Sequence, residues 1–207
     1  MLITICRLYD SYTDANRAVV MLEAAGLPTS ETSVISNNSD TWYRASKAAN
    51  VVPVRKDGAN SKADGKVEGA AIGAAIGATA ATAASLVTML AIPGVGAVVG
   101  AGWLAALLGS ITIGGVAGGL LGALTNAGIS EEDAQVLVEG VRRGGTLVAA
   151  RAPQAELPRI EAIMNPCAVK LQERCELYRK SGWQSFDPNA VPYTADQVRS
   201  ERALHVH

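Results

Sequence analysis

The sequence predicts an α+β fold in which a ferredoxin-like split βαβ domain carries an inserted hydrophobic glycine-zipper α-helical hairpin. Two β-α-β patterns lie toward the ends of the 207-residue chain, in the order expected of a split βαβ sandwich. Between Glu68 and Glu131 no residue is charged and none is histidine, over a length that exceeds two membrane spans of about 20 residues each. Glycines recur there in rows with a spacing of four, which places them on one helical face.

The first half of the split domain is predicted over residues 1–50. Residues 2–9 are a short run of apolar and β-branched side chains, which is typical of a buried strand. Residues 14–25 have apolar positions at helical spacing, and Gly26 ends that pattern. Residues 30–36 predict a second strand. Together these elements form one β-α-β unit.

The second half is predicted over residues 129–183. Ser130 precedes three acidic residues, and this combination of a capping hydroxyl and negative charge stabilises the start of a helix. The tail over 184–207 contains two prolines and little apolar pattern, so we expect extended chain there, with Thr194 as the candidate cap of a short helix. The expected elements of the second half are a helix over 130–143, a strand over 146–151, a helix over 154–164, a strand over 167–173 and a short helix over 174–181.

The insertion joins the second and third predicted strands. Its hairpin spans residues 68–128, and close backbone approach through glycine faces is the expected packing mode. The parts of the insertion are a polar linker over 51–67, a first arm over 69–92, a turn at Pro93 and Gly94, and a second arm over 95–127. The glycines expected to pack one helix against another, or one copy against the next, are Gly69, Gly73, Gly77, Gly96, Gly100, Gly114, Gly115, Gly118, Gly119 and Gly122.

The lengths of the arms favour a membrane setting. As helices they would be about 36 Å and 49 Å long, against a hydrocarbon core of about 30 Å. Basic residues flank the uncharged stretch, so both termini are expected in the cytoplasm of a bacterial inner-membrane protein. Trp103 is a candidate interfacial anchor, with simple core packing as the alternative. Ala and Gly are less apolar than Leu or Ile, so a cytoplasmic soluble assembly with the hairpins buried between subunits stays open.

The sequence contains no recognisable catalytic, cofactor or metal constellation. There is no phosphate-binding GxxxxGK[ST] motif, and the Gly-x-Gly at residues 94–96 does not follow a strand in a βαβ unit. His205 and His207 supply only two ligands on a C-terminal tail. A net charge of −1 and a single Phe argue against nucleic-acid binding. Three cysteines, Cys6, Cys167 and Cys175, do not form a disulfide framework. Buried, inert thiols are expected at Cys167 and Cys175, with redox sensing as the alternative.

Three segments resemble the general stress protein 17M-like (heat-induced stress protein) family of bacteria. They are LYDSYTDANRAVVMLEAAGLPTSETSVISNN, GISEEDAQVLVEGVRRGGTLVAAR and SGWQSFDPNAVPYT, together with an Ile-Pro-Gly turn at residues 92–94. The resemblance implies a ferredoxin-like domain with a membrane-associated hairpin, expression linked to stress, and no established enzyme activity. It implies no catalytic residue.

The function expected from these features is non-enzymatic. The chain is expected to self-associate as a homo-oligomer with membrane lipid around its hairpin, as a structural or accessory subunit that organises a membrane or a larger membrane complex. One alternative is a soluble homo-oligomeric shell or filament. Another, of a different class, is a ligand-sensing regulatory domain whose site lies on the open face of the sheet.

Overall fold

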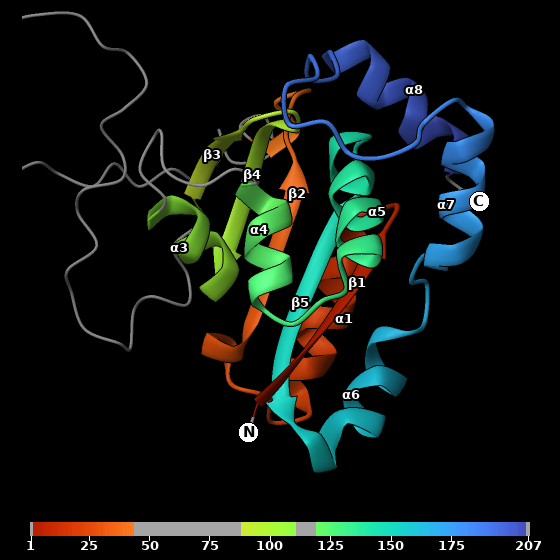
Figure 1. Ribbon diagram of the computed structural model, residues 1–207. Coiled ribbons are helices and arrows are strands. Elements are labelled where there is room, and N and C mark those ends of the chain that lie inside the picture. The colour runs from red at the N-terminus through yellow and green to blue at the C-terminus, as the bar shows by residue number, and fades with distance from the viewer. Residues whose placement is uncertain (1, 44–87, 111–118, 206–207) are drawn as a thin grey trace, which may run out of the picture.

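A five-stranded antiparallel sheet organises the chain in the computed structural model, which describes residues 2–43, 88–110 and 119–205 (Figure 1). The strands are β1 Leu2–Tyr9, β2 Thr32–Asn37, β3 Thr88–Ile92, β4 Gly96–Gly102 and β5 Thr146–Pro153. Their order across the sheet is β1-β5-β2-β4-β3. The prediction of a mixed α+β fold is therefore confirmed.

Helices cover both faces of this sheet. They are α1 Tyr12–Ala24, α3 Trp103–Ser110, α4 Gly119–Asn126, α5 Glu131–Arg142, α6 Leu157–Met164, α7 Leu171–Lys180 and α8 Ala195–His205, with 3-10 turns η1 Thr29–Glu31 and η3 Gln154–Glu156. Side chains of α1 and α6 form one core with one sheet face, and those of α3, α4 and α5 form a second core with the other face. In Figure 1, α4 and α5 lie in front of the sheet and α1 lies behind it.

The alternation of side chains along β1 shows why both faces are apolar. Ile5 and Tyr9 point into the core with α1 and α6, whereas Cys6 and Leu8 point into the core with α3, α4 and α5. The neighbouring strand β5 pairs with β1 on one side and β2 on the other. Because β5 is central and covered on both faces, its run from Thr146 to Ala150 is buried without interruption.

Capping residues set the starts of two helices. The hydroxyl of Ser11 accepts the backbone N–H of Asp14 at 3.0 Å, and Ser130 does the same for Asp133 at 3.2 Å. Helix α1 therefore begins two residues before the predicted position, because Ser11 supplies the cap. The helix predicted from Ser130 is confirmed as α5, and the strand and the helix predicted after it are confirmed as β5 and α6.

The predicted helical hairpin is wrong over the residues that the structure describes. Its first arm ends in a strand, β3, and its second arm begins with another, β4, so the turn at Pro93 and Gly94 joins two strands. Helices α3 and α4 have eight residues each, or about 12 Å, well short of the hydrocarbon thickness of about 30 Å. Within the described ranges, no helix combines the length and the apolarity that crossing a membrane requires. The predictions of a membrane protein and a transmembrane hairpin are corrected accordingly.

The physical reason for this difference is pairing with a sheet edge. The backbone of β4 pairs with β2 over five residue positions, from Ser33 opposite Gly102 to Asn37 opposite Val98. Val98 and Ile92 are buried in the core with α3, α4 and α5. Gly100 allows α3 to approach, since an added Cβ would lie 3.0 Å from that of Ala105. Gly100 was expected to pack one helix against another, and in the structure it allows a helix to pack against a strand.

The other glycines of the predicted rows divide into two groups. Gly96 lies with Gly100 in β4, and Gly119 and Gly122 lie in α4. The linker over 51–67 and the glycines Gly69, Gly73, Gly77, Gly114, Gly115 and Gly118 lie outside the described residues. Self-association through glycine faces stays a prediction.

The C-terminal quarter also differs from its prediction. The strand expected over 167–173 is wrong, since Cys167 has a φ of 62° and α7 already begins at Leu171. This segment still pairs with the outer side of β1 at one point, where the backbone N–H of Val169 donates a hydrogen bond to the carbonyl of Leu8 at 2.8 Å. The tail expected to be mainly extended contains α8, and Thr194, the candidate cap, accepts the backbone N–H of Gln197 at 3.3 Å. Arg202 anchors that helix by donating to the carbonyls of Asn37 and Gly144.

Candidate functional site

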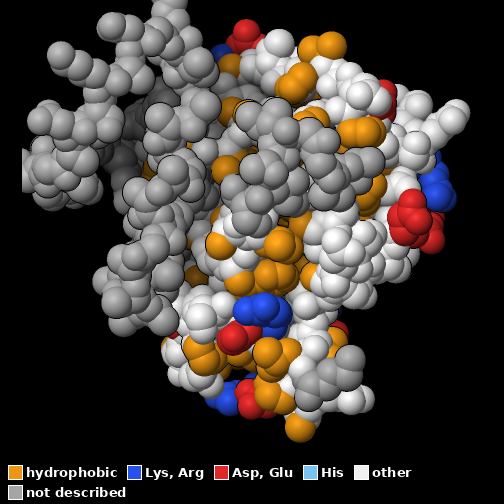
Figure 2. Space-filling model, turned by 60° about the vertical axis from the view of Figure 1, so that its left-hand side comes forward, with side chains coloured by type: hydrophobic (Ala, Val, Ile, Leu, Met, Phe, Trp, Pro, Cys, Tyr) orange, Lys and Arg blue, Asp and Glu red, His pale blue; other side chains and the backbone are white. Residues whose placement is uncertain are grey.

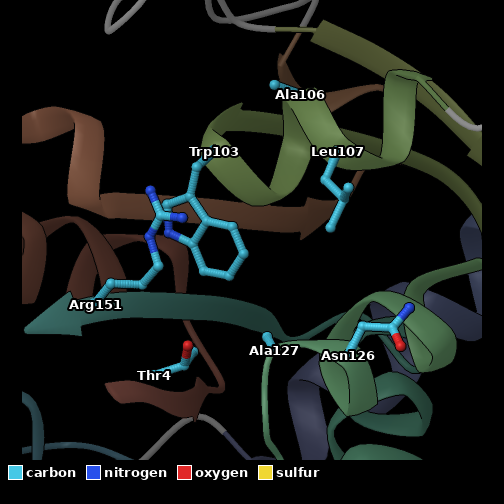
Figure 3. Close-up of a pocket in the computed structure, with 7 residues that line it drawn as sticks. All are labelled: Thr4, Trp103, Ala106, Leu107, Asn126, Ala127 and Arg151. Carbon is cyan, nitrogen blue, oxygen red and sulfur yellow. The ribbon is translucent and has the colours of Figure 1, made fainter. Parts of the chain in front are cut away.

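A cavity of about 500 Å³ opens between α3, the end of α4 and one end of the sheet. It is lined by Thr4, Trp103, Ala106, Leu107, Asn126, Ala127 and Arg151 (Figure 3). Figure 2 shows hydrophobic side chains gathered in the middle of the face toward α3, with basic and acidic side chains together at the lower border of this patch. The volume falls within the range of about 300–1,000 Å³ that is usual for small-molecule sites.

Two strands supply the floor of this cavity. Thr4 of β1 lies directly opposite Arg151 of β5 in the antiparallel register. Both alternate with residues of the core on the α1 and α6 side, so they belong to the face covered by α3, α4 and α5. Both side chains line the cavity at this end of the face.

The wall with the largest side chains comes from α3, which follows β4 without an intervening loop. The junction is Gly102, with a φ of 89°, where an added Cβ would lie 2.1 Å from the carbonyl oxygen of Thr32. Only glycine allows so sharp a change of direction so close to β2. The turn places Trp103 over the sheet, and Leu107 follows one helical turn later on the same side (Figure 3).

Arg151 is held between an aromatic ring and a carboxylate. Its guanidinium carbon lies 4.5 Å from the centroid of the Trp103 ring, a cation–π contact. Its Nε lies 2.8 Å from Oε2 of Glu31, and its Nη2 donates to the carbonyl of Ser30 at 3.4 Å. These contacts fix the side chain among the residues that line the cavity.

Hydrogen-bonding capacity around the cavity is incompletely used. The indole Nε1 of Trp103 is buried and has no hydrogen-bond partner among the described residues. Nε of Arg151 and Oε2 of Glu31 form a close ion pair, yet neither is aligned for a hydrogen bond with any described group. Two N–H donors, on Trp103 and Arg151, and one acceptor, on Glu31, are thus without a hydrogen bond to any described group.

The chemistry of the lining favours binding over catalysis. Of the seven residues that line the cavity, Arg151 alone is ionisable at ordinary pH. The set contains no pair of a nucleophile and a base, and no pair of carboxylates, so it lacks the groups that general acid–base catalysis needs. An apolar wall with a few polar groups at one end is the usual form of a ligand site.

Nearby ionisable groups in the core are held neutral. Burial raises the pKa of the Cys6 thiol to about 12, against the smaller lowering effect of Arg7. Burial likewise raises the pKa of Tyr9 and of Tyr178 to about 12. A thiol with so high a pKa is a poor nucleophile. The expectation of buried thiols agrees with Cys175, which is buried, and is wrong for Cys167, which is exposed.

These raised pKa values predict that the native state loses stability in alkaline solution. As pH rises above about 9, the unfolded chain releases protons that the native core retains, so the free energy of unfolding falls until the pH reaches about 12. The urea midpoint should therefore be clearly lower near pH 11 than near pH 8. The Cys6→Ala variant should show a shallower decline. A midpoint that does not change over this range would contradict the prediction.

Sequence reasoning identified one residue of this cavity and gave it another role. Trp103 was expected either at a membrane interface or in core packing, and it packs against the core and forms the cavity wall. Thr4, Asn126 and Arg151 were missed, because they come from three distant segments that only the folded sheet brings together. The one available signal was a charged residue at position 151 within an otherwise apolar strand. The turn residues Pro93 and Gly94 lie elsewhere, and Pro93 lines a separate groove beside residues 192–195.

Comparison with known proteins assigns the chain to no family. No family model matches the chain, and neither does any curated protein or solved structure. The resemblance to the general stress protein 17M-like family stays a prediction.

Proposed function

We propose that the protein is a non-enzymatic binding domain that takes up one small, mainly apolar molecule in the cavity beside Trp103. The observation that carries this proposal is the cavity itself, with about 500 Å³ of space and an apolar wall formed by Trp103 and Leu107. A regulatory or sensing role fits this arrangement, because a ligand there would contact α3, the end of α4 and the sheet at once. Binding to the native state alone would also stabilise it.

We also propose that the fold is a ferredoxin-like split βαβ domain with an insertion. The units β1-α1-β2 and β5-α6 match the order of a ferredoxin-like split βαβ domain, with β5 between β1 and β2. The segment after α6 returns beside β1, where Val169 donates to Leu8, in the place of a fourth strand. In this description, β3, β4, α3 and α4 belong to the insertion between β2 and β5. The cavity is then built where the insertion meets the split domain.

The proposal predicts saturable binding of a fluorescent probe that reports apolar sites. Titration with 1-anilinonaphthalene-8-sulfonate should give one site per chain, and Leu107→Asn should weaken it about tenfold because an apolar wall is lost. Leu177→Asn is the matched control, since Leu177 is 46% exposed on α7 and Leu107 is 39% exposed on α3. The control should bind like the parent protein.

Two outcomes would refute this function. One is the absence of saturable probe binding to the parent protein under conditions where far-UV circular dichroism shows it folded. The other is an equal loss of binding in Leu107→Asn and Leu177→Asn, since that result would place the probe on the general surface and not in the cavity.

A further inference from the structure

We propose that the ligand of this cavity carries a carboxylate or a similar planar oxyanion, which Arg151 binds, on a compact aromatic body that packs along Trp103 and Leu107. This inference rests on the proposed function and specifies its ligand class. Its basis is the juxtaposition of a single cation, an unsatisfied indole N–H and an apolar wall around one space (Figure 3).

The charge of the lining favours an anion. Arg151 is the one charged member of the seven lining residues, while its partner Glu31 lies outside the lining. Among the described residues, its contacts engage Nε and Nη2. Nε and Nη2 are turned toward Glu31 and Ser30, which leaves Nη1 as the guanidinium nitrogen without an acceptor among the described residues. A carboxylate entering from the cavity would supply an acceptor for Nη1 and a second negative charge beside the guanidinium.

The uncharged hydrogen-bond donors of the cavity also favour a ligand that carries acceptor oxygens. Trp103 Nε1 has no acceptor among the described groups, and a site whose buried donors are unpaired discriminates in favour of a ligand that brings acceptors. Thr4 and Asn126 add a hydroxyl and an amide to the lining (Figure 3). Glu31 is an acceptor, but its negative charge is already directed at Arg151.

The rest of the cavity favours an aromatic body. The guanidinium of Arg151 covers part of the Trp103 ring at 4.5 Å, and Leu107, Ala106 and Ala127 complete the apolar surface. Small side chains at 106 and 127 leave room for a flat ring system beside the larger two. Aromatic rings gain from edge or offset contacts with an indole beyond the area that they bury.

A matched pair of probes tests the charge preference. Isothermal titration calorimetry of the full chain at low ionic strength should show 2-naphthoate binding at least tenfold more tightly than its neutral isostere 2-naphthamide. Added salt should reduce that ratio, because part of it arises from charge attraction. In Arg151→Met the ratio should fall to about one, with little change in naphthamide affinity.

Controls separate this inference from the proposed function and from misfolding. Arg7→Met is the matched variant, since Arg7 is a half-buried, ion-paired arginine of β1, and it should keep the full ratio. Arg151→Lys retains the charge without the planar fork and should give an intermediate ratio, which provides a second variant if Arg151→Met does not fold. Equal binding of both probes to the parent protein would overturn the inference and leave the proposed function standing. Binding of neither would overturn both.

Discussion

Replacing Glu139 by alanine is expected to lower the free energy of unfolding by about 3–5 kcal/mol, as the loss of one partner from a buried ion pair does. The side chain of Glu139 is 1% exposed and lies 3.2 Å from Arg142 and 2.7 Å from Arg143. Burial lowers the pKa of Arg143, but the hydrogen bond and charge of Glu139 outweigh that effect and raise it. Without the carboxylate, two largely buried guanidinium groups would lose their shared counter-charge.

The effect should extend to the C-terminal tail. Arg142 donates to the carbonyl of Val191 at 3.0 Å and lies over the ring of Tyr193, while Arg143 contacts Glu201 of α8 at 3.5 Å. Displacement of either arginine would weaken these contacts. We therefore expect faster proteolysis within 187–205 in Glu139→Ala, in addition to the lower urea midpoint.

An exposed ion pair provides the control for this prediction. Glu161 is 49% exposed and lies 3.4 Å from Arg7, so Glu161→Ala should cost less than about 1 kcal/mol. Glu139→Gln, which keeps the shape and one acceptor, should fall between the two. Urea unfolding that places Glu139→Ala within about 1 kcal/mol of the parent protein would show that the buried pair contributes little.

The second large effect is expected at Gly140, where α5 crosses β1. A Cβ at this position would lie 2.3 Å from Cδ2 of Leu8 and 2.9 Å from its Cδ1. Leu8 is 1% exposed and cannot move outward. Gly140→Ala should therefore destabilise by about 1–3 kcal/mol through overpacking, although alanine in a helix interior is otherwise favoured over glycine by up to about 1 kcal/mol. Gly140→Val should cost more.

A double-mutant cycle with Leu8 isolates this contact. Leu8→Ala alone should cost about 2–5 kcal/mol because it leaves a cavity. Since Leu8→Ala also removes the atoms that meet the new Cβ, the double variant should be more stable than the sum of the single effects predicts. Additivity within about 0.5 kcal/mol, measured by urea unfolding, would contradict close packing at this position.

Local chemistry accounts for the elements that could be predicted from the sequence. The strand over 2–9 and the helices begun by Ser11 and Ser130 depend on side-chain alternation and on caps, which act within a few residues. The strand at 146 is a run of apolar residues that suits a position buried on both faces. Such signals need no distant partner, and the structure has these elements within a few residues of the predicted bounds.

Tertiary contacts determine the secondary structure of residues 88–102 and bring the residues of the candidate site together. Their Ala, Gly and Val composition is compatible with a helix or a strand, and pairing with β2 together with burial of Val98 selects the strand. Trp103 stood out in the sequence as an aromatic residue in an uncharged stretch, but its neighbour Arg151 lies 48 positions away along the printed chain. The sequence by itself therefore determined the locally encoded helices and strands and the absence of a recognisable catalytic motif. The edge strands and the cavity between Trp103 and Arg151 depend on long-range hydrogen bonds and packing, which form only in the folded chain.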